Sequence, residues 1–358
     1  MISHLAPQPH TTDRRRLRIA VVLASLAAAI AGSIVLATNG SEEGATTRGV
    51  TATLHTPGLP EFAAAGPTTL WISIRGRDAP SNGSTWGRLV QINLATGTVR
   101  RTVQLPGQTA SLVRYGNRLI ADPAYAGVHK DVYSSPGELL AIDRQTGRIL
   151  ARRHEQPGDG PLAVGGGRLW AIVEKPAKIL DLNPYTFAPL APPLPLGTSR
   201  LFGLTWGDGY VWATAGDDGD VLRIDPSTRT ITRAHVGGFP IGIILAGGSV
   251  WVIDNANDTV VRLNPNTLRA IGHPIATPSG GAFYLGATGG YVFIANQANG
   301  TVTRINDHTG NTSGPPIRIA PASTNHNYSA AYAIAPAGTA IWATSPTTDT
   351  VSRIQARP

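Results

Sequence analysis

The sequence contains no cysteine in its 358 residues. This absence excludes disulfide bonds, zinc sites built on thiolates, cysteine nucleophiles and lipid attachment through an N-terminal cysteine. Charged residues make up only 15% of the chain, and the lysines are Lys130, Lys175 and Lys178. Long amphipathic helices need more Glu, Lys and Leu than this, so a helical fold is not expected.

Familiar catalytic and metal-binding motifs are also missing. The sequence has no HExxH, GxSxG, Walker or EF-hand pattern, and its nine histidines are scattered. It therefore indicates no catalytic residue, no metal ion and no cofactor. The net charge is +8, yet no basic run follows the N-terminal arginines, so no nucleic-acid partner is expected.

The N-terminal region predicts attachment to a membrane. Arginines around residues 14–18 precede an uncharged stretch that ends near Thr38, and this stretch is long enough to span a bilayer as a helix. We expect residues 1–16 to form a cytoplasmic tail, 17–38 a transmembrane helix and 39–48 a spacer, with residues 49–358 outside the cell. The alternative is a signal peptide cleaved after Ala37, which would make the protein secreted.

Glycine and proline are abundant, with 41 and 28 residues, and five of the seven tryptophans recur at long intervals. Such a balance is typical of many short strands joined by tight turns. Two series of apolar residues mark the intervals. The first series is Trp71, Ile120, Trp170, Trp212, Trp251, Phe293 and Trp342. The second is Ile92, Ile142, Leu182, Ile224, Leu263, Ile305 and Ile354. Both series give seven units of about 45 residues, the signature of a repeat architecture.

The sequence pattern within each unit predicts four strands. In residues 237–275, IGIILAGG, SVWVID, TVVRLN and the weaker RAIGHPI are separated by turn residues. Four-stranded units repeated around an axis form a β-propeller, so the predicted fold is all-β, with seven blades. The last unit ends after its third strand, at residue 358, and residues 49–55 match a fourth strand. We therefore expect the N-terminal strand to complete the last blade and close the ring.

The repeats resemble a known group of propellers. The stretches WVIDNANDTVVRLNPNT, FIANQANGTVTRINDHTG and WATAGDDGDVLRIDPSTRT are similar to YVTN-type repeats of bacterial surface proteins, and more loosely to NHL and virginiamycin-B-lyase-like propellers. The resemblance covers about 49–358 and implies a seven-bladed ring in a bacterial cell envelope. It implies no single activity. Members similar to virginiamycin B lyase are known for catalytic histidines and a metal, and this sequence has no matching histidine pair.

Arg223, Arg262, Arg304 and Arg353 occupy one register of the third strand in four units. This recurrence predicts a structural role, in which the arginines cover apolar surface and bond between blades.

Three connections that share one face of the predicted ring are long, namely 76–87, 122–137 and 321–330. They belong to units that become neighbours when the ring closes, and they mix aromatic with charged residues, as binding sites on loops commonly do. The candidate ligand-binding residues are Arg77, Asp78, Trp86, Asp122, Tyr125, His129, Lys130, Asp131, Tyr133, His326 and Tyr328.

These features favour a membrane-anchored, extracytoplasmic binding or sensor module for a protein, glycan or cell-wall ligand. One alternative is a metal-dependent lyase or lactone hydrolase, although such enzymes need carboxylates, Asn or His on the innermost strands. First strands such as AVGGG, GLTWG and IILAGG contain none of these side chains. A structural envelope assembly protein is the other alternative.

Overall fold

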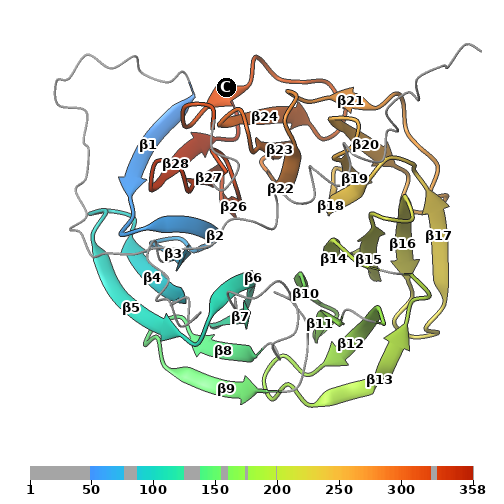
Figure 1. Cartoon of the computed structure of the whole chain (residues 1–358), viewed down its shortest axis with the longest axis horizontal. Helices are drawn as coiled ribbons and strands as arrows, with labels where there is room; N and C mark the ends of the chain where they lie inside the picture. Colours follow the sequence, from blue (N-terminus) through green and yellow to red (C-terminus); the bar gives the residue numbers. More distant parts are fainter. Residues whose placement is uncertain are drawn as a thin grey trace, which may run out of the picture.

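A computed structural model describes residues 49–75, 87–124, 138–154, 160–173, 176–198, 200–323 and 329–357. These residues form a closed ring of seven antiparallel sheets with four strands each (Figure 1). The predicted tail, transmembrane helix and spacer lie outside the described residues. Within the described ranges, no helix is long and apolar enough to cross a membrane.

Each blade extends from an innermost strand beside the axis of the ring to an outermost strand at its rim. Blade 1 contains β2 (Leu59–Ala65), β3 (Thr69–Arg75), β4 (Gly87–Asn93) and β5 (Val99–Leu105). Blade 2 contains β6 (Gln108–Tyr115), β7 (Arg118–Ala124), β8 (Leu139–Asp143) and β9 (Ile149–Arg153). Blade 3 contains β10 (Leu162–Gly165), β11 (Arg168–Val173), β12 (Lys178–Leu182) and β13 (Pro189–Pro195). Blade 4 contains β14 (Gly203–Gly207), β15 (Tyr210–Ala215), β16 (Asp220–Ile224) and β17 (Ile231–His235).

Blades 5 and 6 have shorter outer strands. Blade 5 contains β18 (Pro240–Ala246), β19 (Ser249–Asp254), β20 (Thr259–Leu263) and β21 (Ile275–Ala276). Blade 6 contains β22 (Ala282–Thr288), β23 (Tyr291–Asn296), β24 (Thr301–Asn306) and β25 (Ile317–Arg318). Blade 7 contains β26 (Ile334–Ala337), β27 (Ala340–Ser345), β28 (Thr350–Gln355) and β1 (Val50–His55). The strand predicted over 269–275 is thus reduced to β21, because Gly272 and Pro274 interrupt the backbone pairing.

The N-terminal strand closes the ring, as the sequence predicts. β1 pairs antiparallel with β28, placing Leu54 opposite Val351 and His55 opposite Thr350. The backbone N–H of Thr56 continues this pairing with a 2.8 Å bond to the carbonyl of Asp349. In Figure 1 the blue start of the described chain therefore lies against its red end. Removing this strand would expose the edge of β28.

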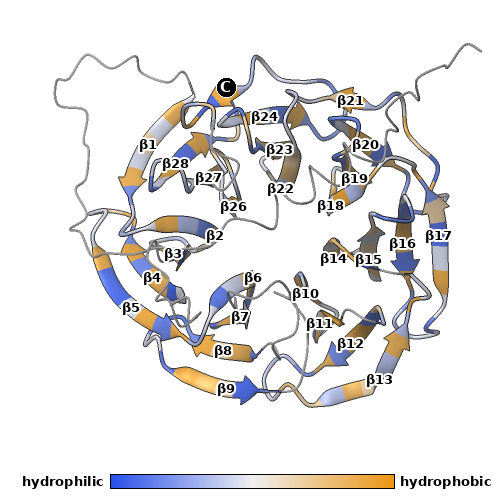
Figure 2. Cartoon of the chain, in the orientation of Figure 1, coloured by the Kyte–Doolittle hydropathy of each residue, from blue (hydrophilic) through white to orange (hydrophobic). Residues whose placement is uncertain are grey.

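The hydrophobic core consists of seven clusters, each of which joins two neighbouring blades. Trp212 of blade 4 packs with Val250 and Val252 of blade 5, and Trp251 of blade 5 packs with Ile294 of blade 6. All fourteen residues of the two apolar series are at most 4% exposed. The outer strands are mixed in character, with hydrophilic and hydrophobic residues along β5 and β17 (Figure 2). The repeat landmarks are therefore the residues that hold the blades together.

The predicted role of the recurring arginines is confirmed at three of four positions. Arg223 donates to the carbonyl of Pro265 at 2.7 Å, and Arg262 donates to that of His308 at 2.8 Å. Arg304 donates at 3.4 Å to the carbonyl of Ala356 in the next blade. The prediction is wrong for Arg353, which bonds to Thr51 of its own blade, the extra residue of a bulge in β1 next to Arg353.

The ring has two faces. Connections between the second and third strands, and from each blade to the next, lie on one face, which we name the loop face. Connections between the first and second and between the third and fourth strands lie on the other, the turn face. The inner strands therefore begin at the loop face and end at the turn face.

Candidate binding site at the mouth of the channel

The predicted binding residues fall almost entirely outside the described part of the chain. Ten of the eleven do so: Arg77, Asp78, Trp86, Tyr125, His129, Lys130, Asp131, Tyr133, His326 and Tyr328. Their prediction as ligand-binding residues therefore stays a prediction. The strands that precede and follow these segments are described, and they locate the corresponding sector of the loop face.

Asp122 is the one predicted site residue that the structure describes. It lies in β7, which continues to Ala124, and its side chain is completely buried. The prediction that Asp122 belongs to a surface loop is therefore wrong. The strand extends three residues further than the turn-like sequence DPAY suggests, so the Asp122 carboxyl lies beneath the loop face.

The long connections start from one sector of the ring. Two of them leave from Arg75 at the end of β3 and from Ala124 at the end of β7, and the third leads into β26. β2 contacts both β6 and β26, so blades 7, 1 and 2 are neighbours, as the closure of the ring predicts. We name the end of the ring axis at the loop face, where the inner strands of this sector begin, the channel mouth.

Aromatic side chains line the channel mouth. The ring of Phe62, on β2, lies edge-on to Tyr284 at 5.4 Å and to Tyr332 at 5.6 Å between centroids. Tyr284 and Tyr332 are 4.8 Å apart, with their hydroxyl oxygens 3.4 Å from each other. Phe283 extends the group, since its ring is 4.9 Å from Tyr284. All four residues are partly exposed, while the hydroxyl groups of Tyr284 and Tyr332 are desolvated, so blades 1, 6 and 7 together present an aromatic surface.

A buried ion pair lies beside the aromatic rings, at the loop-face end of β2 and β3. Glu61 is 5% exposed, and its Oε1 lies 3.3 Å from Nη1 of Arg75, which is 4% exposed. The side-chain amide of Gln108, from blade 2, lies 3.3 Å from the same carboxylate oxygen and 3.3 Å from Nη1 of Arg75, so it contacts both members of the pair. Glu61 therefore connects the inner strand of blade 1 to the second strand of its own blade and to the inner strand of the next.

The protonation properties of this group reflect its burial. Loss of contact with water raises the pKa of Glu61, while the positive charge of Arg75 lowers it to a smaller extent. Desolvation also raises the pKa of Tyr332, and the nearby Glu61 carboxylate raises it further. The pKa of Tyr284 is raised by burial and then by Tyr332. Both tyrosines therefore keep their protons at neutral pH and act as hydrogen-bonding, uncharged side chains.

Hydrogen bonds within and between blades fix the backbone beneath the aromatic rings. The hydroxyl of Ser73 accepts a 2.9 Å bond from the N–H of Phe62, and the hydroxyl of Thr344 in blade 7 donates to the carbonyl of Glu61 at 2.8 Å. These buried contacts hold Glu61 and Phe62 from both sides. The channel mouth thus rests on a rigid support, as a preorganised binding surface requires.

The described inner strands offer little for catalysis by carboxylates or metals. Glu61 is the only Asp or Glu on β2, β6, β10, β14, β18, β22 and β26, and these strands contain no His or Asn. Nor do the described residues contain a group of three or more His, Asp or Glu side chains arranged to hold a metal ion.

Seven residues at or beside the channel mouth were not predicted from the sequence, namely Glu61, Phe62, Arg75, Gln108, Phe283, Tyr284 and Tyr332. A signal exists for Glu61, because EFAAAG places one carboxylate in an inner strand of otherwise apolar and small residues. No comparable signal exists for the tyrosines, whose contact with Phe62 depends on the closure of the ring.

The fold and its channel define the class of the protein as a seven-bladed β-propeller. The sequence matches no protein-family model and no curated protein.

Solved structures resemble the fold over most of the chain. Virginiamycin B lyase from Staphylococcus aureus has a TM-score of 0.64 and 15% identity, and covers 85% of this chain and 98% of its own. The β-propeller domain of Cps50 (Swd1) from Myceliophteria thermophila has a TM-score of 0.61 and 14% identity, and covers 86% and 99%. BamB from Moraxella catarrhalis has a TM-score of 0.54 and 14% identity, and covers 92% and 98%. At these identities the similarity establishes the fold alone.

Proposed function

We propose that the protein is a binding propeller that recognises a partner protein at the channel mouth, with a membrane-spanning segment at 17–38 that holds the ring outside the cell. The observation that carries this proposal is the aromatic surface of Phe62, Tyr284 and Tyr332 beside the buried Glu61–Arg75 pair.

Aromatic rings of this kind suit protein recognition. Tyrosine combines a large apolar area with a hydroxyl group and has few rotatable bonds, so it loses little entropy when a partner binds. Tyr284 and Tyr332 already contact each other and Phe62, so their positions are set before binding. The long connections at 76–87, 122–137 and 321–330 would extend the surface around the mouth.

The chemistry of Glu61 favours binding over catalysis. A catalytic carboxylate needs access to a substrate, whereas Glu61 is buried and contacts Arg75 and Gln108. The Glu61–Arg75 pair therefore helps to fix the positions of the neighbouring aromatic rings.

Site-specific photocrosslinking in cells of the source organism tests the proposal. A photoreactive amino acid placed at Tyr133, in a predicted loop-face connection, should yield a crosslinked adduct whose partner is identified by mass spectrometry. The matched control is Tyr185, a half-exposed tyrosine on the turn face of blade 3. The purified partner should then bind the full-length protein, and Tyr332→Ala should weaken the dissociation constant at least about tenfold, in keeping with an interface hot spot.

Two outcomes would refute the proposal. One is the same adduct from Tyr133 and Tyr185, which shows non-specific proximity. The other is a partner whose affinity is unchanged in Tyr332→Ala while that variant keeps the thermal stability of the parent. Binding of a purified envelope glycan in place of any protein would assign the surface to the glycan alternative.

A further inference from the structure

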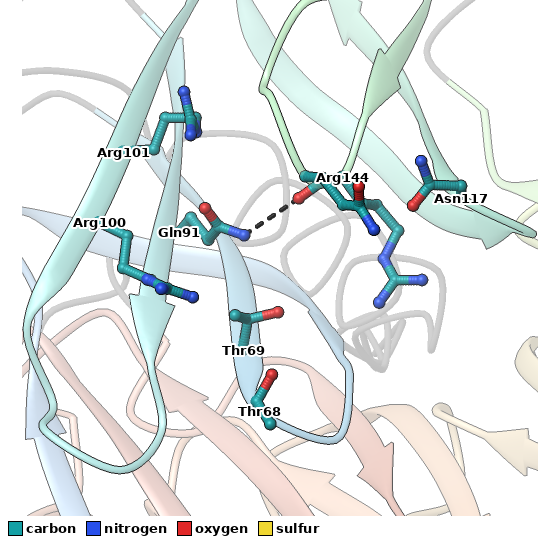
Figure 3. Close-up of a pocket in the computed structure, with 8 residues that line it drawn as sticks. Thr68, Thr69, Gln91, Arg100, Arg101, Asn117 and Arg144 are labelled. Atoms are coloured by element: carbon teal, nitrogen blue, oxygen red, sulfur yellow. Dashed lines mark hydrogen bonds between the residues drawn. The ribbon is translucent and has the colours of Figure 1, made fainter.

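A cavity lies on the turn face, between blades 1 and 2, away from the channel mouth. Its volume is about 410 Å³, within the range typical of small-molecule sites. Figure 3 shows Arg100 and Arg101 on one side and Arg144 on the other, with Gln91 and Thr69 between them. The lining residues are Thr68, Thr69, Gln91, Arg100, Arg101, Asn117, Arg144 and Gln145.

The cavity wall carries positive charge and no negative charge. It contains three arginines and no Asp or Glu. Among the described residues, none of these three guanidinium groups forms an ion pair, whereas Arg168 pairs with Asp181 and Arg233 with Asp220. The neighbouring carboxylate of Asp143 accepts bonds from its own turn and from Asn117.

A β-bulge accounts for the pair of adjacent arginines. Gln91 lies opposite Arg101 and Ile92 lies opposite Val99, so Arg100 is an extra residue in β5. Successive residues of a regular strand point to opposite faces, and a bulge changes that direction. Blades 2 and 3 have bulges at the same register, where the extra residues are the exposed Leu150 and Leu190. Only blade 1 of these three places a charged side chain there.

The junction between blades 1 and 2 also differs from those that use the register arginines. Gln91 occupies the register of Arg223 and Arg262, and its amide donates to the carbonyl of Arg144 at 3.0 Å. The uncharged Gln91 thus makes the bond between the blades. The positive charge at this junction comes instead from Arg100, Arg101 and Arg144, whose guanidinium groups are not needed for that bond.

Arg144 is held in place on the other side of the cavity. Its backbone N–H donates to the carbonyl of Asn117 at 2.9 Å, and its Nη1 donates to the carbonyl of Gly116 at 3.1 Å. A Cβ atom at residue 66 would lie 2.8 Å from Nη2 of Arg144, so Gly66 leaves room for the guanidinium group. Arg144 therefore has a defined position.

The local electrostatics favour an added negative charge. Desolvation lowers the pKa of Arg144, and the positive charge of the nearby Arg114 lowers it further. These two guanidinium groups repel each other, and an anion between the blades would offset the repulsion. Arginine is well suited to this task because its planar group donates two parallel bonds to phosphate or carboxylate oxygens.

We propose that this cavity binds the phosphate group of a small phosphorylated molecule, of about the size of a sugar phosphate. Arg100, Arg101 and Arg144 would contact the phosphate oxygens, while the hydroxyl groups of Thr68 and Thr69 would contact the remainder of the ligand. The site is independent of the channel mouth and of the partner proposed for it.

Isothermal titration calorimetry on the purified full-length protein tests this proposal with three probes: inorganic phosphate, glucose 6-phosphate and glucuronate. We expect both phosphates to bind more tightly than glucuronate, with affinity that falls as salt concentration rises. The variant Arg100→Gln/Arg101→Gln should weaken phosphate binding at least about tenfold, because it removes two charge-assisted contacts. Arg269→Gln is the matched control, since it removes an exposed arginine from blade 5, on another part of the ring, and should leave binding unchanged.

The outcomes separate the possibilities. If Arg269→Gln weakens binding as much as the double variant, the interaction reflects general surface charge and the proposal fails. Tighter binding of glucuronate than of glucose 6-phosphate would overturn the assignment to phosphate. Absence of heat from both phosphates would also refute it, provided that circular dichroism shows a folded β protein.

Discussion

Arg75 and Arg144 belong to neighbouring blades but lie at opposite faces of the ring, and they have opposite surroundings. Arg75 is buried beside the channel mouth and pairs with Glu61, whereas Arg144 lines an open cavity with two other arginines and no carboxylate. A charge that is neutralised internally contributes to the architecture. A charge without an internal counter-charge is available to a ligand, so the comparison distinguishes support from recognition within one repeat fold.

The largest expected effect is on the buried side of this comparison. Arg75→Met should lower the free energy of unfolding by about 3 kcal/mol at pH 7, because it leaves the Glu61 carboxylate buried without the guanidinium. Urea denaturation followed by circular dichroism measures the loss. The double variant Glu61→Gln/Arg75→Met should recover most of it, since no buried charge remains. Equal losses in the single and double variants would show that Arg75 acts through packing alone.

The same variant should show a defined pH dependence. Burial already raises the pKa of Glu61 above its usual value of 4.5, and removal of Arg75 should raise it further. The native state then retains a proton on Glu61 that the unfolded chain releases. The contribution of Glu61 to the free energy of unfolding is therefore greatest below pH 4.5 and falls as the pH rises through the native pKa. The difference between the parent and Arg75→Met should therefore grow from pH 4.5 to about pH 7. A constant difference across that range would contradict this assignment to Glu61.

The smallest effect is expected at the open cavity. Arg144→Gln should change the free energy of unfolding by no more than about 0.5 kcal/mol in phosphate-free buffer, because the lost bond to Gly116 is offset by relief of repulsion from Arg114. Thermal unfolding with and without phosphate measures this. Added phosphate should raise the melting temperature of the parent and not that of the variant. A loss as large as that of Arg75→Met would remove the distinction between the two arginines.

Much of the ring could be predicted because its signals recur. Large apolar residues recur at the positions of Trp71 and Ile92 in every unit, and each of them packs between two blades. Seven repeats of this pattern therefore indicate seven similar contacts between blades. The closing pair of β1 and β28 could be predicted for a related reason, since the last unit lacks a strand that residues 49–55 supply. Recurrence also led to the error at Arg353, where the neighbouring strand comes from the other end of the chain.

The candidate sites could not be predicted in the same way, because they depend on departures from the repeat. Phe62 meets Tyr284 and Tyr332 only through the closed ring, and no spacing along the chain encodes that contact. A bulge brings Arg100 to its cavity, and although blades 2 and 3 have bulges at the same register, only blade 1 has an arginine at the extra position.

The sequence by itself determined the number of blades, the residues between them and the strand that closes the ring, because each blade buries its apolar face with the same kinds of side chain. Only the tertiary structure decided which polar groups neutralise one another. Polar groups interact through space, and residues far apart in the chain, such as Glu61 and Gln108, become neighbours when the blades assemble around the axis.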